Sequence, residues 1–128
     1  MRTIHTDDAP AHVGPVPQAV EAAGWIFVSA LFGARPADHV IPADAELEAN
    51  QIFDNLTAIL AAAGADLTNV VRVGIVMRHL QQDRPTFNRV WKERFGDHRP
   101  ARSAIESAAF GRPDENPRFM VEVTAYRG

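Results

Sequence analysis

The chain contains no cysteine among its 128 residues and a single lysine, Lys92. The absence of cysteine excludes disulfides, thiolate metal sites and cysteine nucleophiles, and it is typical of a cytoplasmic protein, which we expect here. The arginines are scattered rather than clustered, and the formal net charge is −3. A general nucleic-acid binder normally presents a basic face, so we do not expect nucleic acid as a partner.

Long apolar runs are also missing. Stretches such as residues 58–65 are far too short to cross a bilayer, and the N-terminus has no apolar signal core. We therefore expect no membrane partner. Hydrophobic residues make up 46% of the chain and charged residues 23%, which is an ordinary globular balance. This length suits one domain with a real core, so we predict a single domain over residues 1–128.

Motifs for metals and nucleotides are missing as well. The five histidines show no metal-like spacing to one another or to paired carboxylates. The glycines form neither a dinucleotide-binding fingerprint nor a phosphate-binding loop. Ser29 follows an apolar strand pattern without the glycines of a nucleophile elbow, so we interpret it as a hydroxyl lining a cleft. We predict neither a metal nor a cofactor.

The apolar periodicity predicts two helices and several strands. Helical patterns cover residues 44–63, with Asp44 as the cap, and residues 83–95, with Asp83 as the cap and Pro85 in the first turn. Loops rich in proline or glycine are expected at 6–17, 33–42 and 111–117. Alternating or β-branched patterns indicate strands at 2–5, 25–29, 70–77, 101–107 and 119–126.

This order of elements predicts a two-layer α+β domain, with both helices on one face of a mixed sheet. The other face then carries Val, Ile and Met side chains that no helix covers. Exposed apolar area of this kind favours association, so we predict a homo-oligomer.

The most informative residue is Arg102, because an arginine just inside a short apolar strand is an unusual place for a permanent charge. Its guanidinium carries N–H donors in a planar fork that matches a carboxylate in a two-point contact. Such an arginine has either an internal acidic partner or a place for an acidic ligand.

Alternation along the last two strands places acidic residues within possible reach. Ala104 and Glu106 share a strand face with Arg102, and Met120 shares a face with Glu122. The two carboxylates and the arginine converge if these strands pair or meet across a subunit boundary. The simpler alternative is that Glu106 or Glu122 neutralises Arg102.

Several short motifs follow one another along the chain in a characteristic order and spacing, and this ordered set is more specific than any one motif. They are Ala9-Pro10, Gly14-Pro15, Gln18-Ala19-Val20, Ser29, Gln51, Asn55-Leu56, Ala62-Ala63-Gly64-Ala65, Val70-Val71, Asn88 and Pro100-Ala101-Arg102-Ser103. Over almost its whole length the chain resembles the YjgF/Rid family of reactive intermediate deaminases, formerly named endoribonuclease L-PSP.

The resemblance implies a chorismate-mutase-like α+β fold and a homotrimer with clefts between adjacent subunits. It also implies hydrolysis of reactive 2-imino acids to 2-keto acids and ammonia, so that the ligand is a small carboxylate or imino acid. Arg102 matches the arginine that holds the substrate carboxylate, and Ser29 matches a serine of the cleft.

Three departures from the family pattern bear on the site. Val16 stands where many deaminases have tyrosine, Ala104 where cysteine is frequent, and Met120 where a glutamate positions the attacking water. Glu122 matches the following glutamate, and the loop 110–117 is a few residues longer than usual. We predict Arg102 and Glu122 as catalytic residues. The predicted substrate-binding residues are Arg102, Ser29, Val16, Asn88, Ala104 and Met120.

Two functions from different classes stay open. The first is a deaminase for small 2-imino acids or enamines, of full or weakened activity. The second is a non-catalytic trimer that binds a small carboxylate as a sensor or buffer. Arg102 favours both, whereas Val16 and Met120 favour the second or a larger hydrophobic substrate. Ribonuclease activity is a distant third, since no basic groove supports it.

Overall fold

The computed structural model describes residues 1–12, 14–112 and 114–128. Val13 and Pro113, which belong to the predicted loops 6–17 and 111–117, lie outside the described residues. The elements are β1 (Arg2–Ile4), β2 (Ala19–Ala22), β3 (Trp25–Leu31), α1 (Ala45–Ala62), the 3₁₀ turn η1 (Leu67–Asn69), β4 (Val70–Met77), α2 (Leu80–Phe95), β5 (Ala101–Glu106) and β6 (Phe119–Tyr126).

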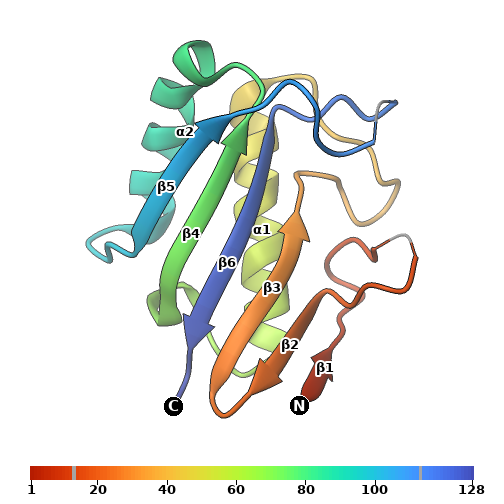
Figure 1. The fold of residues 1–128 in the computed structure, drawn as a ribbon, viewed down its shortest axis with the longest axis vertical. Coiled ribbons are helices and arrows are strands. Elements are labelled where there is room, and N and C mark those ends of the chain that lie inside the picture. Colours follow the sequence, from red (N-terminus) through yellow and green to blue (C-terminus); the bar gives the residue numbers. More distant parts are fainter. Residues whose placement is uncertain (13, 113) are drawn as a thin grey trace.

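Six strands form one mixed sheet in the order β1-β2-β3-β6-β4-β5, and both helices cover the same face of it (Figure 1). β4 and β5 run parallel, and the other neighbouring strands run antiparallel. The C-terminal strand β6 therefore lies in the interior of the sheet, and β5 forms one edge. This arrangement confirms the predicted two-layer α+β fold.

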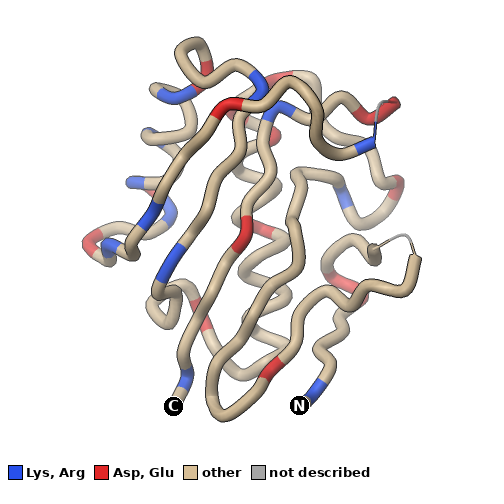
Figure 2. Tube along the Cα trace, in the orientation of Figure 1, with Lys and Arg blue, Asp and Glu red and all other residues tan. Residues whose placement is uncertain are grey.

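Alternation along β6 separates the two faces of the sheet. Phe119 and Val121 are buried in the core under the helices, whereas Glu122 and Tyr126 are exposed on the opposite side. Charged residues are sparse along the central strands (Figure 2), and β3 has none. We call this second side the uncovered face. Its exposed large hydrophobic residues are Trp25, Phe27, Ile105 and Tyr126.

Helix α1 forms as its pattern predicts. The Asp44 side chain accepts a hydrogen bond from the Leu47 amide at 3.0 Å, and Phe53 and Leu56 are buried against the sheet. Gly64, with φ of 76°, follows the helix in the left-handed conformation that ends many helices. Neither α1 nor any other helix of the described segments combines the length and apolar character needed to span a membrane.

Helix α2 begins earlier than predicted. It starts at Leu80 after His79, and Asp83 is a buried residue inside the helix rather than its cap. The cap comes instead from Glu106 at the end of β5, whose Oε1 accepts a hydrogen bond from the Leu80 amide at 2.9 Å. A carboxylate satisfies free N–H groups at a helix start and opposes the helix dipole. Pro85 consequently lies inside the helix.

Strand β2 was not predicted. It pairs with β3 across a two-residue turn at Ala23 and Gly24, whose φ angles are 53° and 86°. Two consecutive positive φ angles are the hallmark of a tight hairpin turn. The strand escaped prediction because Ala-Val-Glu-Ala has little β-branched character, and pairing with β3 rather than local preference stabilises it.

Candidate functional site

Arg102 lies on the edge strand β5 and is half-buried against helix α2. Its guanidinium carbon is 4.8 Å from the ring centroid of Trp91 and 5.9 Å from that of Phe87. Burial, followed by the charge of Arg84, lowers the pKa of the Arg102 guanidinium, which nevertheless stays charged. No ion pair between described residues includes Arg102. Its N–H donors are therefore available to an anion.

Two other predicted site residues lie on β5, which carries Arg102, and on α2, whose aromatic rings Arg102 contacts. Ala104 packs against the hydrophobic core from β5, and Asn88 is exposed on α2 directly after Phe87 in the sequence. Glu106 shares the strand face with Arg102, but its carboxylate binds the amide of Leu80 at the start of α2. The alternative that Glu106 neutralises Arg102 is therefore wrong.

Glu122 lies on the opposite face of the sheet from Arg102. It is exposed on β6, and its register partner on β4 is Gly74, which in turn pairs with Ser103 on β5. Because β4 separates β5 from β6, these two strands do not pair within the chain. Arg102 and Glu122 therefore do not converge in one chain, and Glu122 does not neutralise Arg102 there. Met120 is half-buried on β6.

Ser29 lies on β3 and Val16 precedes β2, and two strands, β6 and β4, separate β3 from β5 in the sheet. The Ser29 hydroxyl donates a hydrogen bond to the Pro17 carbonyl at 2.6 Å. The pairing of β3 with β6 is irregular between Val28 and Leu31, next to this serine. Val16 is 47% exposed. Within one chain the predicted site residues thus form two separate groups, one on β5 and α2 and one around β3 and β6.

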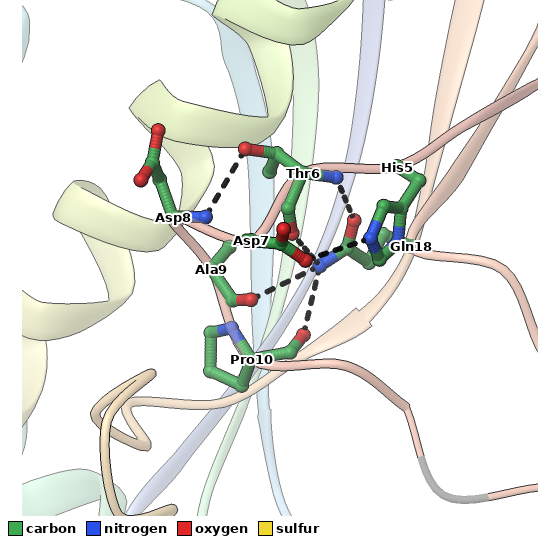
Figure 3. Close-up of polar contacts among 7 residues, drawn as sticks. All are labelled: His5, Thr6, Asp7, Asp8, Ala9, Pro10 and Gln18. Carbon is green, nitrogen blue, oxygen red and sulfur yellow. Dashed lines mark hydrogen bonds and ion pairs between the residues drawn. The ribbon is translucent and has the colours of Figure 1, made fainter.

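Gln18 anchors the segment that precedes β2, a role that sequence reasoning missed. Its buried side-chain amide donates to the carbonyls of Thr6, Ala9 and Pro10 at 3.0, 3.2 and 3.1 Å, and its oxygen accepts from the Thr6 amide at 2.8 Å (Figure 3). One side chain therefore hydrogen-bonds with four backbone groups of a loop that has no strand pairing to bind them. The sequence signal was the Gln18-Ala19-Val20 motif of the family resemblance, which does not by itself indicate what the glutamine side chain binds.

Glu48 is a buried carboxyl in α1 that sequence reasoning also missed. Its Oε2 accepts hydrogen bonds from the backbone amides of Arg118 and Phe119 at 2.8 and 3.1 Å, where β6 begins. Burial raises the pKa of Glu48 to about 7 despite these two hydrogen bonds and the charge of Arg118, and nearby Asp83 adds to the rise. Glu48 thus fixes the start of the strand that carries Met120 and Glu122.

A cavity of about 500 Å³ opens next to the end of β3. The predicted site residues do not line it, so it is distinct from the surroundings of Arg102. Burial lowers the pKa of His12 in its wall. The described residues contain no group of three or more metal-ligating side chains that could hold an ion. Residues around the cavity include His12, Phe32, His39, Arg112 and Glu115.

The fold and these side chains define a two-layer α+β protein with an arginine at one sheet edge that stacks on aromatic rings and forms no ion pair with a described residue. The family model described as Endoribonuclease L-PSP matches residues 6–126, and the chain belongs to this family, also known as the YjgF/Rid family. The 2-iminobutanoate/2-iminopropanoate deaminase of Bos taurus is 36% identical over 99% of this chain and 90% of its own length.

Solved structures agree with the family assignment. The YjgF gene product of Escherichia coli superposes with a TM-score of 0.91 at 32% identity, covering 100% of both chains. Escherichia coli TdcF with bound serine superposes with a TM-score of 0.92 at 29% identity, again over 100% of both chains. The resemblance that the sequence motifs carry is thereby confirmed.

Proposed function

We propose that the chain hydrolyses small 2-imino acids and their enamine tautomers to 2-keto acids and ammonia, acting in the cytoplasm. The observation that carries the proposal is Arg102, a half-buried guanidinium whose donors meet no carboxylate of the described residues. The name of the bovine relative supports the same reaction. The serine bound to Escherichia coli TdcF supports a small amino-acid-like ligand.

The reaction needs little apparatus. Water adds to the carbon of the protonated imine, a proton moves to the nitrogen, and the carbon–nitrogen bond breaks to release ammonia and leave a carbonyl. The protein must hold the carboxylate, orient the imine carbon and position the water. Arg102 suits the first task. Because Met120 has no acidic group, the water is held by Glu122 or by a backbone carbonyl.

A coupled assay tests this proposal directly. An amino-acid oxidase would generate 2-imino acids of increasing side-chain size, and semicarbazide would trap whatever the protein leaves unhydrolysed. We expect the protein to reduce the semicarbazone signal, most strongly for larger apolar side chains because Val16 and Met120 are apolar. An unchanged signal for every imine would contradict the proposal.

The opposed positions of Arg102 and Glu122 bear on assembly. If both act on one substrate molecule, they must come from different subunits. The uncovered face supplies the apolar surface that association needs, since Trp25, Phe27 and Tyr126 are exposed there and the Trp25 and Tyr126 rings lie 4.7 Å apart. We therefore propose a homotrimer that buries this face and forms its sites between adjacent subunits.

The Phe27→Glu substitution should dissociate the oligomer. Phe27 is 46% exposed in the single chain, so the charge costs little within the fold but would be buried unpaired in an interface. Light scattering coupled to gel filtration would measure the mass. The matched control is Leu47→Glu, because Leu47 is an equally apolar side chain, 60% exposed on helix α1. Equal masses for wild type and Phe27→Glu would contradict burial of this face.

Mixing two defective chains tests whether the site is shared. Arg102→Ala and Glu122→Gln homo-oligomers should each be slow, the second by about 10²–10⁴ if Glu122 is the general base. Subunits mixed in equal amounts should regain about one quarter of wild-type activity, because a cyclic trimer pairs an intact arginine with an intact glutamate at that frequency. No recovery would contradict a shared site, and a fully active Glu122→Gln would remove Glu122 from the mechanism.

The alternative is a non-catalytic trimer that binds a small carboxylate. Met120 favours it, because this position of β6 offers no base. In that case 2-oxobutanoate should raise the melting temperature of the wild type and not of Arg102→Ala, while no imine is hydrolysed faster than in buffer.

A further inference from the structure

An aromatic platform lies beneath the guanidinium of Arg102. Trp91 and Phe87, both on α2, place their rings 4.8 and 5.9 Å from its central carbon. A cation stacked on an aromatic face is attracted by the electrons of the ring and does not use its N–H groups. The edge of the guanidinium therefore stays free to donate in two-point fashion, while its plane is constrained.

The Trp91 ring of the platform packs against phenylalanine rings of the core. The Trp91 ring lies 4.6 Å from that of Phe95 and 6.4 Å from those of Phe53 and Phe87. These three phenylalanines are buried, whereas Trp91 is only half-buried at the rim of the cluster. Close packing of this kind leaves the indole few alternative rotamers. The surface it offers to Arg102 is therefore fixed by the core.

The arginine side chain is flexible, so an aromatic platform that restricts its conformations favours ligand binding. An arginine side chain carries several rotatable bonds, and ordering it opposes the binding of a ligand. No carboxylate of the described residues forms an ion pair with Arg102. Glu106, which shares its strand face on β5, instead caps helix α2. The stacking partner is the group that can order it before a ligand arrives.

We infer that Trp91 is a positioning residue that holds the Arg102 guanidinium ready for a two-point contact with the substrate carboxylate. The identity of the substrate rests on the proposed function, whereas the stacking does not. Because the carboxylate is held alike in the bound substrate and in the transition state, loss of the platform raises KM and leaves kcat nearly unchanged.

Three variants separate positioning from stability. Trp91→Leu should raise KM about fivefold to tenfold with kcat within about twofold, as expected for the loss of a cation–π contact that orders a binding group. Trp91→Phe, which keeps an aromatic face, should return KM to within about twofold of wild type. Ile59→Val is the control for stability, because Ile59 is fully buried on α1 and lies outside the aromatic cluster that holds Trp91. It should lower the melting temperature and leave KM unchanged.

A resonance of the arginine itself supplies a readout that does not need activity. The Arg102 Hε signal, identified by its loss in Arg102→Lys, should be shifted upfield by the indole ring. The shift should disappear in Trp91→Leu and persist in Ile59→Val. An Hε signal at the same position in wild type and Trp91→Leu, or an unchanged KM in Trp91→Leu, would overturn the inference.

Failure of the proposed function would look different. In that case the wild type would hydrolyse no imine, and the Kd for 2-oxobutanoate would replace KM in the same three variants. A Kd raised about fivefold to tenfold in Trp91→Leu and restored in Trp91→Phe would support the positioning role. An equal Kd in all three variants would overturn it.

Discussion

Replacing Arg102 with alanine should lower kcat/KM for imine hydrolysis by about 100-fold or more. Hydrogen bonds to charged groups each contribute about 1.5–3 kcal/mol, and a two-point contact loses two of them at once. Every 1.4 kcal/mol is about a tenfold change. The side chain is only half-buried at the sheet edge, so we expect a small change in melting temperature. Steady-state kinetics in the semicarbazide assay would measure the loss.

Arg102→Lys is the informative companion to this variant. Lysine keeps the positive charge but loses the planar fork and its stacking on Trp91. We expect intermediate activity, with more of the defect in KM than in kcat. If Arg102→Ala leaves both imine hydrolysis and carboxylate binding intact, the carboxylate anchor lies elsewhere, and the role implied by the family motif does not hold for this chain.

The Glu48→Gln substitution should stabilise the protein above pH 7 and remove much of the pH dependence of its stability. Burial raises the pKa of Glu48 from an ordinary 4.5 to about 7 in the folded chain. The folded state therefore holds this proton more tightly than the unfolded state does. The contribution to stability is complete below pH 4.5 and is lost as the pH rises to about 7.

The size of this effect follows from the shift in the pKa. Each unit corresponds to about 1.36 kcal/mol, so the folded state loses up to about 3 kcal/mol by pH 8 as Glu48 ionises. A glutamine oxygen can accept both amide hydrogens of Arg118 and Phe119 without ionising. Urea unfolding of wild type and Glu48→Gln at pH 5 and pH 8 would measure the difference between the two free energies of unfolding.

Glu46→Gln is the control for this experiment. Glu46 lies on the same helix but is exposed and forms a surface ion pair with Arg89 at 3.4 Å, so its removal should change stability by less than about 1 kcal/mol at either pH. Comparison with the wild type also cancels the titration of the histidines. A Glu48→Gln protein less stable than wild type at pH 8 would contradict the raised pKa.

Local sequence patterns predicted those features of the protein that depend on contacts between residues close together in the chain. Asp44 and Gly64 bound helix α1 because caps act on neighbouring backbone groups, and alternation marked β4 and β6 because side chains of a strand point to opposite faces in turn. The two-layer α+β class follows from the order of these elements. The motifs of the family resemblance are likewise short and local, and their ordered set along the chain allowed the family to be named from the sequence.

Other features depended on contacts between residues far apart in the chain. The cap of α2 is Glu106, and the start of β6 is held by Glu48, in each case across many residues of sequence. β2 exists because β3 pairs with it, and Gln18 became an anchor only when its loop folded back onto it.

The sequence by itself determined that Arg102 and Glu122 lie on two separate strands whose side chains alternate between faces. It also determined the family to which the chain belongs. Only the tertiary structure decided that β4 lies between their strands and that the two side chains leave opposite faces of the sheet. Strand order is set by how whole elements bury their apolar faces against one another, and no local pattern encodes it. The stacking of Arg102 on Trp91 was decided in the same way, by the packing of α2 beneath the edge strand.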